Sequence, residues 1–120
     1  MATRALSGSW IARGVHKTVW AGILNGDDGA PQSASMLSDK SVQVTGTPGV
    51  GGTLVIEGSN DNGVTYHTLN DSRGETTGLL SFTAADLRTI LENVQLIRPR
   101  CTAGDGSTNW TVSLIEESPK

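Results

Sequence analysis

The sequence has a single cysteine, Cys101, and only two histidines, His16 and His67. One cysteine excludes an intrachain disulfide, and the three residues lack the spacing of a zinc site. No apolar run approaches the ~20 residues that cross a membrane, and the amino-terminal segment lacks the apolar stretch of a signal peptide. These absences predict a protein without metal or membrane span that is made in a cytoplasm.

Motifs of catalysis and nucleotide binding are also missing. Residues 46–52 have the glycine spacing of a phosphate-binding loop, but Gly52 occupies the position of the essential lysine. The Asn–Asp–Gly clusters at 25–29 and 60–63 lack the ligand spacing of a calcium loop and are typical of turns. No Gly-x-Ser-x-Gly elbow is present. The sequence therefore predicts no enzyme activity, no cofactor and no small-molecule substrate.

Charge is distributed unevenly along the chain. Residues 1–26 contain three basic residues and no acidic one, whereas the remainder contains six basic and twelve acidic residues. The net charge of −3 argues against binding nucleic acid over a whole surface. The basic, acid-free segment instead indicates an arm that docks on an acidic neighbour.

Short β-rich segments separated by turn signals make up most of the chain. Alternating apolar and polar residues predict strands at 41–45 and 109–115, and this pattern of strands and turns predicts an all-β, mainly antiparallel β-sandwich over residues 17–117. One short α-helix is expected near residues 84–92, because Leu87, Ile90 and Leu91 fall on one helical face. Pro99 places its strand at a sheet edge or at a bulge.

Residues 1–16 show no strand alternation and are interpreted as an extended amino-terminal arm outside the sandwich. Four of its residues, Arg4, Trp10, Ile11 and Arg13, are candidate protein-binding residues, since exposed Trp, Ile and Arg side chains are effective interface anchors. The apolar pair supplies buried area in this interpretation, and the two arginines orient the arm on its partner.

A set of strings in a fixed order then points to a family. The strings lie at 20–29 (WAGILNGDDG), 41–46 (SVQVTG), 56–63 (IEGSNDNG), 68–71 (TLND), 80–85 (LSFTAA) and 97–106 (IRPRCTAGDG). Over roughly residues 18–115 they resemble the capsid decoration, or cement, proteins of tailed bacteriophages, which have a jelly-roll-like β-sandwich. The resemblance implies binding to the assembled major capsid protein at the virion surface. It also implies a homodimer or homotrimer made in the cytoplasm of a bacterial host.

Two other functions stay open at this point. Residues 56–63, followed by Tyr66 and Leu69, also look like a hairpin of discoidin-type lectin sandwiches, which implies a carbohydrate-binding or adhesion module. Another structural component of a phage head or tail would share the fold. Neither alternative involves nucleic acid or a membrane.

Overall fold

The computed structural model describes residues 1–34, 37–71 and 78–118, which form strands in two sheets and no helix. The order across the five-stranded sheet is β10 (Asp86–Thr89), β6 (Asp39–Thr47), β12 (Asn109–Glu117), β3 (Val15–Leu24) and β2 (Leu6–Ala12). The path across the seven-stranded sheet is β1 (Thr3–Arg4), β4 (Asp28–Gly29), β11 (Leu96–Ala103), β7 (Thr53–Ser59) and β8 (His67–Thr68). In this second sheet β5 (Gln32–Ser33) also pairs with β11, and β9 (Ser81–Phe82) pairs with β7.

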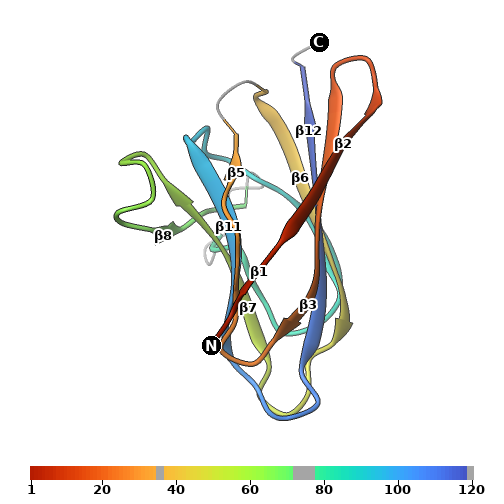
Figure 1. Cartoon of the computed structure of the whole chain (residues 1–120), viewed down its shortest axis with the longest axis vertical. Helices are drawn as coiled ribbons and strands as arrows, with labels where there is room; N and C mark the ends of the chain where they lie inside the picture. The colour runs from red at the N-terminus through yellow and green to blue at the C-terminus, as the bar shows by residue number, and fades with distance from the viewer. Residues whose placement is uncertain (35–36, 72–77, 119–120) are drawn as a thin grey trace.

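All the strand pairs are antiparallel except β1 with β4, and Figure 1 shows the two sheets facing each other. The all-β, mainly antiparallel fold predicted from the sequence is therefore confirmed, and its arrangement is sandwich-like. The jelly-roll description stays a prediction.

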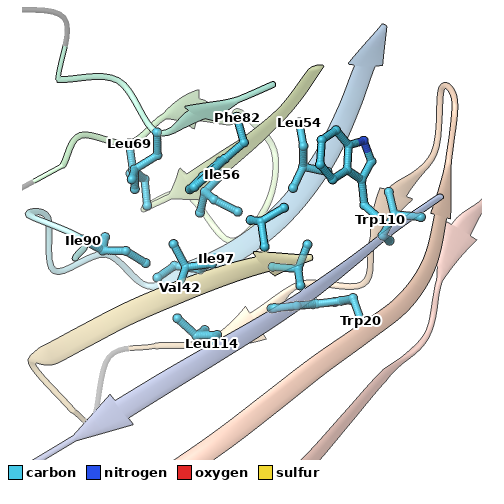
Figure 2. Packing of buried hydrophobic residues seen from close by; sticks show 14 of the residues in the cluster. Trp20, Val42, Leu54, Ile56, Leu69, Phe82, Ile90, Ile97, Trp110 and Leu114 are labelled. Atoms are coloured by element: carbon cyan, nitrogen blue, oxygen red, sulfur yellow. The ribbon is translucent and has the colours of Figure 1, made fainter. Parts of the chain in front are cut away.

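Side chains from both sheets meet in one hydrophobic core (Figure 2). The predicted alternation at 41–45 and 109–115 is confirmed, because Val42, Val44, Trp110, Val112 and Leu114 are all at most 1% exposed. The opposite sheet contributes Leu54, Ile56, Phe82, Ile97 and Cys101 to the same cluster. Burial of these apolar side chains supplies the main force that holds the sheets together.

The prediction of a short α-helix near residues 84–92 is wrong. Residues 86–89 form strand β10, which pairs with β6 in the register Asp86–Val44 to Thr89–Ser41. Only Ile90 of the apolar trio is buried, while Leu87 and Leu91 are more than half exposed. A helix of two to three turns is marginal without a face to bury, and pairing with β6 satisfies the backbone of this segment instead.

The amino-terminal arm also differs from its predicted place outside the sandwich. β1 pairs with β4, and β2 pairs with β3 along the edge of the five-stranded sheet. Leu6 even packs against the core. The alternation is hidden because the core-side row of β2, which is Leu6, Gly8 and Trp10, includes a glycine.

Pro99 lies in β11, which has neighbours on both sides. On the β7 side it lies opposite Ile56. On the other side β5 pairs with Leu96 and Ile97, and β4 pairs with Arg100, so the register leaves a gap at residues 98–99. A proline, which has no N–H to donate, fits that gap. The expected bulge lies further on, between Cys101 and Ala103.

Candidate interaction surface

The β2–β3 hairpin projects from the end of the molecule where the carboxyl terminus lies (Figure 1). Its turn contains Gly14 with a φ of 72°, a conformation that side chains other than glycine rarely adopt. The Ser118 N–H donates a 2.9 Å hydrogen bond to the Gly14 carbonyl. The last residue of the described chain thus supports the hairpin turn.

Three of the four predicted binding residues lie on this hairpin and are exposed. Trp10 is 61% exposed and Ile11 is 56% exposed, and Arg13 lies exposed in the turn. A register shift between Trp10 and Ala12 makes Ile11 the extra residue of a β-bulge. A bulge bends its strand and redirects a side chain, so Ile11 departs from the regular pairing that ends at Trp10.

Arg4 is separated from the other three and is bound within the fold. Its Nε lies 2.7 Å from Oδ2 of Asp27, which is only 4% exposed. Asp27 also accepts hydrogen bonds from the backbone N–H groups of Ala2 and Leu24. Burial raises the pKa of Asp27, but the hydrogen bonds from Arg4, Ala2 and Leu24 outweigh it and lower that pKa. Arg4 therefore ties β1 to the turn before β4.

A row of polar side chains that the sequence analysis did not single out crosses the five-stranded sheet beside Trp10. Direct strand pairing aligns Trp10 with His16, His16 with Glu116, and Glu116 with Lys40. The Trp10 and His16 rings meet edge to face at 5.1 Å, and His16 Nδ1 lies 4.0 Å from Oε1 of Glu116. A signal was present, because Lys40 and Glu116 continue the core-side alternation of Val42 and Leu114.

Both charged members of this row are buried. Lys40 is 4% exposed and donates hydrogen bonds from Nζ to Asn93 Oδ1 at 2.5 Å and to the Ser38 carbonyl at 3.3 Å. Burial lowers the pKa of Lys40, while Glu116 opposes that shift. Burial raises the pKa of Glu116, which is 2% exposed, while Lys40 opposes that shift. The two charges therefore compensate for each other's loss of solvent.

A small cavity of about 160 Å³ adjoins this row. Its lining consists of Trp10, His16, Gln32, Ser33, Leu37 and Glu116. Trp10 therefore shares this cavity with His16 and Glu116 of the polar row and with Gln32 and Ser33 of β5. One side of the exposed indole thus faces other residues of the protein, including the His16 ring.

A second charged cluster covers the outer face of the seven-stranded sheet. Arg98 binds Asp28 at 3.2 Å and Glu57 at 3.1 Å, and its guanidinium lies 3.7 Å from the centre of the Tyr66 ring. Arg100 binds the other oxygen of Glu57 at 3.3 Å. Asp28 and Glu57 are at most 7% exposed. These charges are satisfied within the protein and cross-link β4, β7 and β11.

A groove with a volume of about 530 Å³ lies beside β8. Polar side chains, including Asn60, Asp61, Thr65, His67 and Glu92, form much of its lining. Within the described residues, no group of three or more His, Cys, Asp or Glu side chains is arranged to hold a metal ion. The same residues contain no helix that is long and apolar enough to cross a membrane.

The comparisons with known proteins identify the fold. Neither a protein-family model nor a curated protein sequence matches the chain. The crystal structure of YomS, a protein derived from the SPBc2 prophage, aligns with a TM-score of 0.65 and 12% identity over 92% of this chain and 100% of that one. The crystal structure of BH2720 from Bacillus halodurans aligns with a TM-score of 0.52 and 16% identity over 98% of this chain and 74% of that one. At these identities the similarity shows a shared fold, and one of the two proteins that share it comes from a prophage.

Proposed function

We propose that this protein is a structural component of a tailed-phage virion, a decoration protein that binds the assembled major capsid protein and stabilises the shell. The observation that carries the proposal is the projecting β2–β3 hairpin with exposed Trp10, Ile11 and Arg13. The prophage origin of a protein with the same fold supports the phage setting. The proposed role consists of binding alone, at the virion surface, after synthesis in the bacterial cytoplasm.

The physical basis is linkage between binding and assembly. A protein that binds the assembled shell but not the free subunits stabilises the shell by mass action. Exposed Trp, Ile and Arg are side chains that contribute strongly when an interface buries them. The hairpin presents them on a backbone that is already ordered by pairing of β2 with β3, so binding carries little of the ~1–2 kcal/mol per residue that ordering a free arm costs.

The test compares binding of point variants to expanded, undecorated capsids by co-sedimentation. Deletion of residues 2–14 is unsuitable, because those residues pair with β3 and β4. Ile11→Ser combined with Arg13→Ser changes only exposed positions of the hairpin, and Val64→Ser, at a position that is 84% exposed elsewhere, is the matched control. We expect the hairpin variant to bind at least about tenfold more weakly, a loss of ~1.4 kcal/mol, with an unchanged melting temperature.

Added salt should weaken wild-type binding only in part, because screening affects Arg13 but not the apolar anchors. Wild-type protein that does not sediment with capsids would contradict the proposal, and a tail or head–tail assembly would then be the next structure to test. If the hairpin variant binds as tightly as wild type, the capsid contact would be sought instead in the segment at 25–40 or the loop at 46–52.

The carbohydrate-binding alternative has less support from the geometry. Sugar sites use open aromatic faces, but Trp20 and Trp110 are at most 1% exposed and Arg98 stacks on one face of Tyr66. Trp10 is exposed, but it lies on the β2–β3 hairpin and does not line the groove beside β8. The groove beside β8 has polar side chains that a sugar could bind, yet among the described residues no Trp, Tyr or Phe lines it. Glycan-array binding by the wild-type protein would favour this alternative.

A further inference from the structure

Strand β2 is a sheet edge whose regular stretch, Leu6–Trp10, lacks the features that usually protect such edges, because its β-bulge comes only after Trp10. An edge strand presents unpaired N–H and C=O groups, and proteins guard it with charges, proline or very short length. The opposite edge of the same sheet, β10, has only four residues and carries Asp86 and Arg88. At the ends of the other sheet, β1 and β8 have two residues each. β2 has seven residues, LSGSWIA, with no charge and no proline.

The side chains of β2 divide into two rows. Pairing with the buried Trp20 and Thr18 of β3 places Leu6, Gly8 and Trp10 on the core side of the sheet, and Ser7 and Ser9 on the outer side. An added Cβ at Gly8 would lie 3.0 Å from Cε1 of His16, so the imidazole would have to move slightly to admit a side chain there. The regular stretch Leu6–Trp10 ends at the bulge that begins after Trp10.

We infer that the β2 edge pairs antiparallel with β2 of a second copy of this chain, about a two-fold axis at Gly8. In this register Trp10 of one copy lies opposite Leu6 of the other on the core side, and Ser7 lies opposite Ser9 on the outer side. The pairing joins two five-stranded sheets into one continuous sheet.

A second copy fits this edge because the regular stretch is complementary to itself. A two-fold interface places the same patch on both partners, and a strand without charges meets its own copy without repulsion. The symmetric register forms the contact between Trp10 and Leu6 twice, and cross-strand pairs of an aromatic with an aliphatic side chain stabilise a sheet. It also removes from solvent a tryptophan that is 61% exposed in the single chain.

In such a dimer, neighbouring residues of the hairpin have separate roles. Trp10 packs within the dimer, whereas Ile11 and Arg13, beyond the regular stretch, stay outside it and remain available to the shell. A single pair of short strands buries less area than a standard stable interface, so the dimer is expected to be weak and concentration-dependent. Self-association is measured without capsids, so its failure is distinguishable from a failure of the proposed function.

The test is sedimentation velocity of the full chain over a dilution series, with variants at the exposed positions 7 and 9. In the proposed register, Ser7→Lys with Ser9→Lys places lysine opposite lysine twice, whereas Ser7→Lys with Ser9→Glu places lysine opposite glutamate twice. Since like charges directly opposite are destabilising, we expect the first variant to associate about tenfold more weakly and the second to match wild type. Leu87→Lys on the opposite edge is the control and should leave association unchanged.

Circular dichroism of each variant verifies the fold before association is compared. A wild-type protein that stays monomeric at its highest soluble concentration would overturn the inference, as would a closed trimer. Equal association by the two charge variants would also overturn it, because it would place the contact away from β2.

Discussion

Arg98 shows how a single side chain connects distant parts of this fold. Its guanidinium binds Asp28 of β4 and Glu57 of β7 and stacks on Tyr66, and it is 21% exposed. Arg98→Met should lower the free energy of unfolding by about 2–3 kcal/mol, because two carboxylates lose their main partner in a largely desolvated place. Arg100→Met on the same strand face is the control and should cost less than about 1 kcal/mol, since that side chain is 48% exposed.

Denaturant unfolding of both variants at neutral pH measures the difference. An equal loss of unfolding free energy in the two variants would show that burial does not determine how much these ion pairs stabilise the fold. Arg98 and Arg100 are two residues apart on β11 and so share a strand face, but the sequence does not show their partners. Asp28 and Glu57 are far from Arg98 in sequence, and only the packing of β4 and β7 beside β11 brings them together.

At the scale of elements, β6 and β12 place two buried, oppositely charged side chains at paired positions, Lys40 opposite Glu116. Lys40→Met or Glu116→Leu alone should each destabilise the protein by about 2–4 kcal/mol, because each leaves one buried charge without its compensating partner. The double variant should recover most of that loss, since apolar side chains tolerate the buried positions. A double-mutant cycle by denaturant unfolding gives the coupling, which should exceed ~1 kcal/mol.

Additive losses in that cycle would contradict the compensation between the two charges. His16 and Gln32 also face Glu116, and both stay unchanged through the cycle. The remaining polar groups of the row are therefore the same in all four proteins, and the coupling reports the Lys40–Glu116 pair.

The elements that the sequence predicted well are those with clear alternation. Residues 41–45 and 109–115 lie in β6 and β12, and their apolar rows are buried. The prediction failed where pairing with a neighbouring strand, and not the spacing of apolar residues, decides the structure. Leu87, Ile90 and Leu91 have helical spacing but belong to a segment that pairs with β6, and residues 6–12 lack visible alternation because Gly8 interrupts the core-side row. The structure places the candidate residues Trp10, Ile11 and Arg13 exposed on the β2–β3 hairpin, and their binding role stays a prediction.

At the scale of the whole molecule, two surface carboxylates, Asp61 and the half-buried Asp105, hold loops in different regions of the fold. Asp105 accepts hydrogen bonds from the Ser107 hydroxyl at 2.7 Å and from the Val50 N–H at 3.0 Å, and so joins the loop at 46–52 to the loop before β12. Asp61 accepts from the Ser59 hydroxyl at 2.7 Å and from the Thr65 N–H at 2.9 Å in the loop after β7. These hydrogen bonds favour the ionised form and lower the pKa of each carboxyl from 3.8 to about 2.

These shifts predict how stability depends on acid pH. A carboxyl whose pKa is lower in the folded state stabilises the fold above its unfolded pKa, and that contribution is lost as pH falls through the folded pKa. Glu116 acts in the opposite direction, because its raised pKa favours the folded state when the group is protonated. Asp61, Asp105 and Asp27 outnumber it, so the melting temperature should fall between about pH 4 and pH 2. The Asp61→Asn, Asp105→Asn double variant should show a shallower fall in this window, measured by circular dichroism melts. A wild-type melting temperature that stays level to pH 2, or a double variant that declines as steeply, would show that these two loops do not couple to global stability.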